Sequence, residues 1–243
     1  MKKNMYFKYI VNMKLLELFS GTHSIGKVAK ERNIEVVSLD RDLPADIEED
    51  IMTWNYKIYP QGHFDIITAS PVCLWWSICR QCWIGRKIKA HGDKILTKEI
   101  IQEDIDKYGK PMVDKVREII NYFKPKYYWI ENPQTSRMKT YITDLPYYDV
   151  DYCKYSDWGY KKRTRFWSNI KGFNNKLCKK DCNNIIEINN TKGHKGSCGN
   201  GRFNKKLKKH AKDVSKEYGG GNNKLDRYRI PPKLINELLD CCK

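Results

Sequence analysis

A cysteine and a glutamate in this sequence each follow a short apolar run. Cys73 ends the segment Ser70-Pro71-Val72-Cys73, directly after the run 64–69, and Glu131 follows the run 127–130. Both runs are typical of buried strands. In open α/β sheets the chemistry takes place at the carboxyl ends of the strands, and a thiol held there can act as a nucleophile. The alternative is that Cys73 is a small buried apolar residue and that Glu131 only caps a strand end.

A second segment has the pattern of a cofactor-binding turn. Residues 14–19 predict a strand and residues 26–32 a helix, and Gly21 lies in the turn between them. Such a turn directs backbone N–H groups and a helix amino terminus toward a ligand. Asp40 follows the next apolar run, 34–39, at the place where an acid often binds ribose hydroxyls. Because no G-x-G-x-x-G motif is present, a cofactor with one ribose and a carboxylate is favoured over a dinucleotide. The alternative is a tight turn with an incidental acid.

The elements that must position these residues alternate between strands and helices. This order predicts an α/β, Rossmann-like fold with a mainly parallel sheet. Residues 112–123 carry apolar side chains at helical spacing, which predicts a packing face. We expect four regions: a loose extension (1–12), a catalytic domain (13–171), a small irregular basic lobe (172–223) and a carboxyl-terminal segment that returns to the catalytic domain (224–243).

The composition indicates a polyanionic partner. The 243 residues carry a formal net charge of +17, and nucleic acid is the commonest partner of so basic a surface. A solvated lysine-rich surface is the alternative. The nine cysteines are scattered and odd in number, which predicts reduced thiols in a cytosol-like, intracellular compartment. We expect a monomer with no membrane span.

Basic and aromatic residues alternate after Cys73, where Trp75, Trp76 and Trp83 lie among arginines and lysines. This pattern suits contact with phosphates and an unstacked base. The residues that we expect to contact nucleic acid are Arg80, Arg86, Lys87, Lys161 and Lys162.

The predicted basic lobe contains a candidate zinc site. Cys178, Cys182, His194 and Cys198 form a C-x3-C-x11-H-x3-C pattern, in which two close pairs are separated by a loop. A tetrahedral zinc ion would substitute there for a missing apolar core. Free surface cysteines in a loop are the alternative.

Taken in order, these motifs resemble those of the S-adenosylmethionine-dependent DNA cytosine-5 methyltransferases, in particular the compact forms of phages and large DNA viruses. The resemblance covers about residues 13–170 and 227–239. Its motifs are Phe19-Ser20-Gly21, Asp40, Asp50-Ile51, Ser70-Pro71-Val72-Cys73, Glu131-Asn132 and Arg163-Thr164-Arg165.

The resemblance implies a class I methyltransferase fold and methyl transfer from S-adenosyl-L-methionine to carbon 5 of cytosine in DNA. It implies that Cys73 adds covalently to a flipped base and that Glu131 binds ring nitrogen 3. Arg163 and Arg165 would hold the base oxygen and position Glu131. The implied cofactor contacts are Phe19, Ser20, Gly21 and Thr22 for the methionine part, Asp40 for the ribose, Asp50 and Ile51 for the adenine, and Ser70 and Pro71 beside them.

Three alternatives stay open. An amino-group methyltransferase acting on adenine or cytosine places its signature at the same strand end but needs an aromatic residue where Cys73 stands. A catalytically inactive nucleic-acid-binding homologue would keep the fold without turnover. An RNA substrate is the third, since no motif reads or rejects a 2′-hydroxyl.

Overall fold

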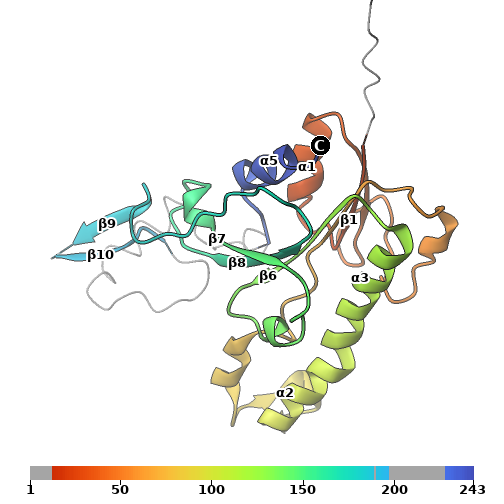
Figure 1. Cartoon of the computed structure of the whole chain (residues 1–243). Coiled ribbons are helices and arrows are strands. Elements are labelled where there is room, and N and C mark those ends of the chain that lie inside the picture. Colours follow the sequence, from red (N-terminus) through yellow and green to blue (C-terminus); the bar gives the residue numbers. More distant parts are fainter. Residues whose placement is uncertain (1–12, 189, 197–227) are drawn as a thin grey trace, which may run out of the picture.

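A six-stranded sheet with strand order β2-β1-β3-β6-β8-β7 forms the centre of the molecule (Figure 1). The computed structural model describes residues 13–188, 190–196 and 228–243. The predicted extension 1–12 lies outside these residues, as does most of the predicted basic lobe. Strands β2, β1, β3 and β6 are parallel, and β8 runs antiparallel to both β6 and β7. The predicted Rossmann-like fold with a mainly parallel sheet is therefore confirmed.

The main strands are β1 (Lys14–Leu18), β2 (Glu35–Leu39), β3 (Ile66–Ala69), β6 (Tyr127–Pro133), β7 (Tyr147–Asp151) and β8 (Arg163–Ser168). The described residues form the helices α1 (Ser24–Glu31), α2 (Lys98–Asp104), α3 (Lys110–Phe123) and α5 (Pro232–Asp240). Two small hairpins pair β4 (Lys87–Ile88) with β5 (Lys94–Ile95) and β9 (Ile185–Ile188) with β10 (Thr191–His194). Short 3₁₀ turns occupy Tyr56–Ile58, Ile78–Trp83, Lys89–His91, Arg137–Thr140 and Tyr152–Lys154, and a π-helical turn, Ile105–Gly109, joins α2 to α3.

Apolar helix faces cover both sides of the sheet. The predicted packing face of 112–123 is confirmed, because Val113, Val116, Ile119 and Phe123 are all buried in one core cluster. Helices α1 and α5 lie side by side on the opposite face, where they share the second core cluster (Figure 1). The carboxyl ends of the parallel strands are left for the loops that carry the site residues.

A glycine in α1 allows this helix to lie close to β1. Both oxygens of the buried Glu17 carboxylate accept backbone hydrogen bonds in the first turn, from Ile25 N at 3.2 Å and Gly26 N at 3.1 Å. A Cβ atom on Gly26 would lie 2.5 Å from Glu17 Oε2 and 3.3 Å from Val36 Cγ1. A side chain therefore fits only if the buried, hydrogen-bonded carboxylate shifts.

We expect the Gly26→Ala substitution to destabilise the protein, although alanine favours helices. The overpacking should cost about 1–3 kcal/mol, which exceeds the propensity gain of about 1 kcal/mol. Urea unfolding of the variant measures this loss. The control is Lys27→Ala at the exposed neighbouring position, which should change stability little. A Gly26→Ala variant as stable as the wild type would contradict the close contact.

Candidate active site

The Cys73 thiol and the Glu131 carboxylate lie at neighbouring strand ends. Cys73 follows β3, and Glu131 lies near the end of β6, which pairs with β3 in parallel. Asn132 joins the two segments, because its Nδ2 donates a hydrogen bond to the Pro71 carbonyl at 3.0 Å. Cys73 is partly buried and Glu131 is only 7% exposed. The structure therefore brings together the predicted nucleophile and the predicted acid.

Burial and charge set the protonation of this pair. Burial raises the pKa of Cys73, the Glu131 carboxylate raises it further, and the Lys162 ammonium lowers it. Burial likewise raises the pKa of Glu131, while Lys162 and the Tyr152 hydroxyl lower it. Lys162 Nζ lies 3.8 Å from Glu131 Oε1, and Tyr152 Oη donates to the same oxygen at 3.3 Å. Glu131 thus stays protonated to a higher pH than an exposed glutamate.

Lys162 and Tyr152 occupy the position that the sequence analysis gave to the arginines. Lys162 was expected only to contact nucleic acid, and Tyr152 was not singled out. The Lys162 ammonium also lies over the Tyr152 ring, 4.9 Å from its centroid. Both residues therefore belong to the surroundings of Glu131.

Arg163 and Arg165 do not support Glu131 in this structure, contrary to the prediction. Arg163 makes two hydrogen bonds to Asp151, at 2.9 and 2.8 Å, and Arg165 makes two to Asp149, at 2.7 and 2.9 Å. The reason is the alternation of side chains along β8. Glu131 pairs with Phe166 and so lies on the opposite face of the sheet from both arginines.

The predicted cofactor residues gather at the carboxyl ends of β1, β2 and β3. Gly21 N donates to Asp40 Oδ2 at 2.9 Å, and the second Asp40 oxygen accepts from the backbone of Asp42 and Leu43. Phe19 and Gly21 both have positive φ, 58° and 54°, which makes a tight turn before α1. The turn predicted from Gly21 and Asp40 is therefore locked by the acid itself.

The other predicted cofactor contacts lie around this turn. Thr22 Oγ1 lies 2.9 Å from Ser24 Oγ, and Ser70 N donates to the Leu18 carbonyl at 3.2 Å, which places the Cys73 segment beside the turn. Pro71 is buried. Asp50 accepts from Met52 N and pairs with Arg41, whereas Ile51 packs in the core.

One polar atom in this region is left for a ligand. The Ser20 hydroxyl is buried and has no hydrogen-bond partner among the described residues. A buried polar group without a partner is costly, so a polar ligand at the turn would satisfy it. Together with the positive-φ turn and the nearby acid, the residues fit a nucleoside cofactor that carries a polar amino-acid part.

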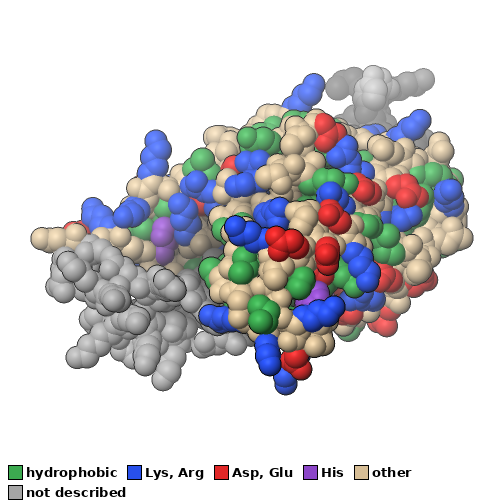
Figure 2. All heavy atoms as spheres, turned by 90° about the horizontal axis from the view of Figure 1, so that it is seen from below, with side chains coloured by type: hydrophobic (Ala, Val, Ile, Leu, Met, Phe, Trp, Pro, Cys, Tyr) green, Lys and Arg blue, Asp and Glu red, His purple; other side chains and the backbone are tan. Residues whose placement is uncertain are grey.

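The residues expected to contact nucleic acid divide into two groups. Arg86 and Lys87 are exposed at the β4–β5 hairpin, as a DNA contact requires. Arg80 is not available, contrary to the prediction: it is 5% exposed and pairs with Asp104, with its guanidinium 5.6 Å from the Trp75 ring centroid. Lys161 pairs with Asp151 at 3.4 Å. On the face seen in Figure 2, basic side chains are spread among acidic ones.

Three of the four predicted metal ligands come together. Cys178, Cys182 and His194 form one cluster, which Cys153 completes. Cys198 lies outside the described residues. Cys153 was missed because it lies 25 positions before Cys178, outside any close pair of ligands.

None of the described helices is long and apolar enough to cross a membrane.

No protein-family model matches the chain. Among solved structures, the chain is similar to Entamoeba histolytica methyltransferase EhMeth (TM-score 0.46, 16% identity, 69% of this chain and 56% of that one). It is also similar to S. pombe Dnmt2 methyltransferase (TM-score 0.36, 16% identity, 66% and 51%) and to a mutant Spodoptera frugiperda DNMT2 (TM-score 0.42, 15% identity, 68% and 53%). The chain spans about half the length of these solved proteins.

The parallel sheet, the turn after β1 and the thiol–acid pair at the strand ends define a Rossmann-like methyltransferase. A similar protein of known family shows which methyltransferase family the chain belongs to. The chain is 41% identical over 234 residues to the "Probable DNA (cytosine-5)-methyltransferase" of Frog virus 3 (isolate Goorha), a match that covers 95% of this chain and all of that protein. The chain therefore belongs to the DNA (cytosine-5)-methyltransferase family.

Proposed function

We propose that this protein transfers a methyl group from S-adenosyl-L-methionine to carbon 5 of cytosine in DNA. The observation that carries the proposal is the Cys73 thiol beside the buried Glu131, at the same sheet edge as the turn of residues 19–22. The Frog virus 3 relative is named as a probable DNA (cytosine-5)-methyltransferase, which supports DNA cytosine as the substrate.

The reaction needs the thiol because carbon 5 of cytosine is too poor in electrons to attack a methyl donor directly. The Cys73 thiolate forms a bond to carbon 6, which converts the ring to an enamine and makes carbon 5 nucleophilic. The bound cofactor supplies an electrophilic methyl group on a sulfonium. After transfer, carbon 5 loses its proton, the electron pair re-forms the ring double bond, and the bond from Cys73 sulfur to carbon 6 breaks.

Glu131 stabilises the adduct from the opposite side of the ring. As the thiolate adds, negative charge moves toward ring nitrogen 3, where a protonated carboxyl donates a hydrogen bond or its proton. The raised pKa of Glu131 supports this role, since burial favours the protonated form. Lys162 opposes that shift and favours the Cys73 thiolate, so one cation influences both partners.

Residues of the β1 turn would hold the cofactor. The Ser20 hydroxyl, which has no partner among the described residues, would bind the amino-acid part, and Asp40 and Asp50 would supply acceptors for the nucleoside hydroxyls and adenine. Because Asp40 also fixes Gly21, its loss would disturb both the turn and the cofactor.

The target atom lies inside the duplex, so the base must be flipped into the site. The exposed Arg86 and Lys87 lie on the segment that follows Cys73 and suit contact with the backbone phosphates. Binding to DNA should therefore weaken steeply with salt.

Covalent trapping tests the proposed function. With cofactor and DNA that contains 5-fluorocytosine, we expect a stable adduct at Cys73, because carbon 5 then carries fluorine in place of the proton that must leave. Peptide mapping by mass spectrometry locates the modified residue. Unmodified DNA should gain 5-methylcytosine.

Two other results would contradict this function. If N4-methylcytosine or N6-methyladenine is the product, the amino-group alternative is correct. If neither adduct nor product forms although DNA and cofactor bind, the protein is a binding homologue. An RNA of the same sequence in parallel tests the third alternative.

A further inference from the structure

Four side chains outside the active site converge where the β9–β10 hairpin joins the sheet. Cys153 lies in the 3₁₀ turn after β7, Cys178 and Cys182 flank the turn before β9, and His194 ends β10. Their ligand atoms all lie within 4.8 Å of one another. The described cysteines are all free thiols. Cys153 and Cys178 are buried, so the cluster is not a set of loose surface side chains, and it has no role in the proposed reaction.

The two sulfur–nitrogen distances to His194 match a tetrahedral zinc site. His194 Nε2 lies 3.6 Å from Cys178 Sγ and 3.5 Å from Cys182 Sγ. With Zn–S of about 2.3 Å and Zn–N of about 2.0 Å, a tetrahedron places sulfur and nitrogen about 3.5 Å apart. We propose that Cys153, Cys178, Cys182 and His194 bind a zinc ion. Because all four positions are filled by protein, the site is structural and not catalytic.

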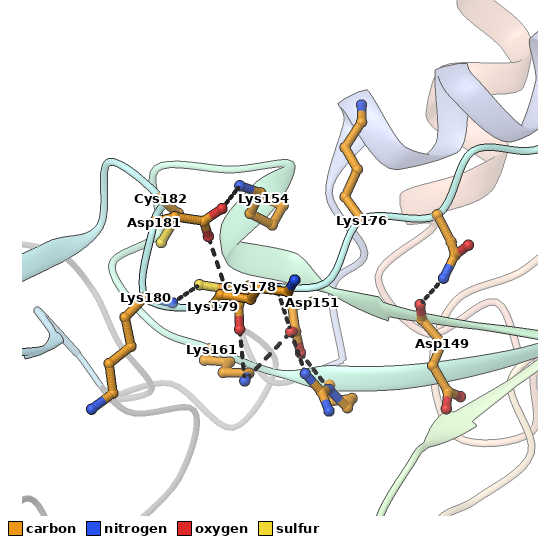
Figure 3. Close-up of polar contacts among 12 residues, drawn as sticks. Asp149, Asp151, Lys154, Lys161, Lys176, Cys178, Lys179, Lys180, Asp181 and Cys182 are labelled. Atoms are coloured by element: carbon orange, nitrogen blue, oxygen red, sulfur yellow. Dashed lines mark hydrogen bonds and ion pairs between the residues drawn. The ribbon is translucent and has the colours of Figure 1, made fainter.

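The surroundings of the cluster support thiolate ligands. Lys180 N donates to Cys178 Sγ at 3.3 Å, and Lys161 Nζ lies 3.4 Å from the Cys178 carbonyl (Figure 3). Lys154, next to Cys153, pairs with Asp181 in the same turn at 3.1 Å. Three thiolates, a neutral imidazole and Zn²⁺ carry one net negative charge, which the hydrogen bond from Lys180 N to Cys178 Sγ stabilises. Hydrogen bonds of this kind to the ligands are typical of protein metal sites.

A buried asparagine orients the loops that carry the ligands. Asn184, 2% exposed, donates to the carbonyls of Cys153 at 3.1 Å and Ser156 at 2.7 Å. Its side-chain oxygen accepts from Gly159 N at 3.1 Å. The ligand-bearing turn of Cys153 is thus attached to Asn184, which lies two residues after Cys182.

A metal supplies the stability that this region lacks. The β9–β10 hairpin is a separate two-stranded sheet, and an isolated hairpin is marginally stable in water. The described residues between Phe173 and Gly196 include few large apolar side chains. A zinc ion that cross-links residues 153, 178, 182 and 194 replaces the missing core, because its binding free energy becomes folding free energy.

The same ion would fix residues beside the active site, a step that rests on the proposed function. Cys153 follows Tyr152, whose hydroxyl contacts Glu131. Cys178 N donates to Asp151 at 2.7 Å, and Asp151 also holds Arg163 (Figure 3). The zinc site therefore anchors the turn behind the catalytic carboxylate as well as the hairpin.

Metal analysis of the purified full-length chain tests the proposal. We expect about one equivalent of zinc per chain in the wild type. Cys153→Ser and Cys182→Ser should lose it, whereas Cys82→Ser, at an exposed cysteine outside the cluster, should keep it. Cys198→Ser should also keep its zinc, which separates this ligand set from the one expected from sequence spacing. A wild type without zinc, or a Cys153→Ser variant with a full equivalent, would overturn the proposal.

A second measurement does not depend on the folding of any variant. A strong chelator should lower the thermal unfolding temperature of the wild-type protein, and equimolar zinc should restore it. An unchanged unfolding temperature with complete metal removal would overturn the structural role. Neither measurement uses DNA or S-adenosyl-L-methionine, so their failure is distinct from failure of the proposed function.

Discussion

Replacing Cys73 with alanine is expected to lower the rate of methyl transfer by about four orders of magnitude or more. Without a thiolate at carbon 6, carbon 5 stays too poor in electrons to attack the methyl donor. Comparable losses follow removal of the nucleophile in other enzymes that use covalent catalysis. Transfer of tritiated methyl groups to DNA under single-turnover conditions measures the loss.

The control for Cys73→Ala is Cys82→Ser, which changes an exposed cysteine in the 3₁₀ turn Ile78–Trp83 and should leave the rate nearly unchanged. Cys73→Ala should also bind DNA and cofactor as the wild type does, since Cys73 is assigned no role in binding either ligand. Retention of more than about a tenth of the rate would be incompatible with covalent catalysis. It would favour direct transfer to an amino group.

The strands and helices that carry the site could be predicted because their patterns are local. The runs 64–69 and 127–130 became β3 and β6, and the helical pattern of 112–123 lies within α3. The strand ends differ from the predicted ones by a few residues. β6 continues to Pro133 because it pairs with β8, a strand that begins 30 positions later. The apolar run itself does not indicate a pairing partner so distant in sequence.

The pairing register of β7 and β8 decides which acids contact Arg163 and Arg165, and the motif alone does not contain this register. Arg163 and Arg165 lie two positions apart on β8, and Asp149 and Asp151 lie two positions apart on β7. Each arginine therefore faces one aspartate on the neighbouring strand. The matching spacing of these two pairs was a usable signal, since opposite charges facing one another stabilise neighbouring strands. The family motif includes the arginines but not the acids of β7 that pair with them.

The burial of Arg80 could not be predicted from its neighbours in the sequence. Its basic and aromatic neighbours predicted an exposed DNA contact, but Asp104 and His91 lie beside it in the folded chain, with His91 Nε2 3.0 Å from Asp104 Oδ2. A buried charge needs a partner, and nothing in the local sequence identifies an acid 24 positions away. Lys162 is the opposite case: a residue expected at the surface contacts the central carboxylate.

The opposite effects of Glu131 and Lys162 on one thiol lead to the second large prediction. In Glu131→Gln, methyl transfer should fall by about two to three orders of magnitude, because the amide cannot supply a proton at ring nitrogen 3. The same variant should lower the pKa of Cys73, because the carboxylate that raises it is gone. Lys162→Met should raise the pKa of Cys73, because it removes the cation that lowers it.

The rate at which Cys73 reacts with iodoacetamide reports these pKa changes without DNA or cofactor. The thiolate is the reactive form, so the rate rises with pH as Cys73 ionises. This rise should occur at lower pH in Glu131→Gln and at higher pH in Lys162→Met than in the wild type, as measured by peptide mapping. Lys161→Met is the matched control: this neighbouring lysine pairs with Asp151, so its loss should move the rise little.

If both Glu131→Gln and Lys162→Met shift the rise in the same direction, the charges do not act on Cys73 as the structure places them. A slow Glu131→Gln enzyme with a more reactive thiol would separate the two roles of the carboxyl group, because only its proton donation would then limit methyl transfer.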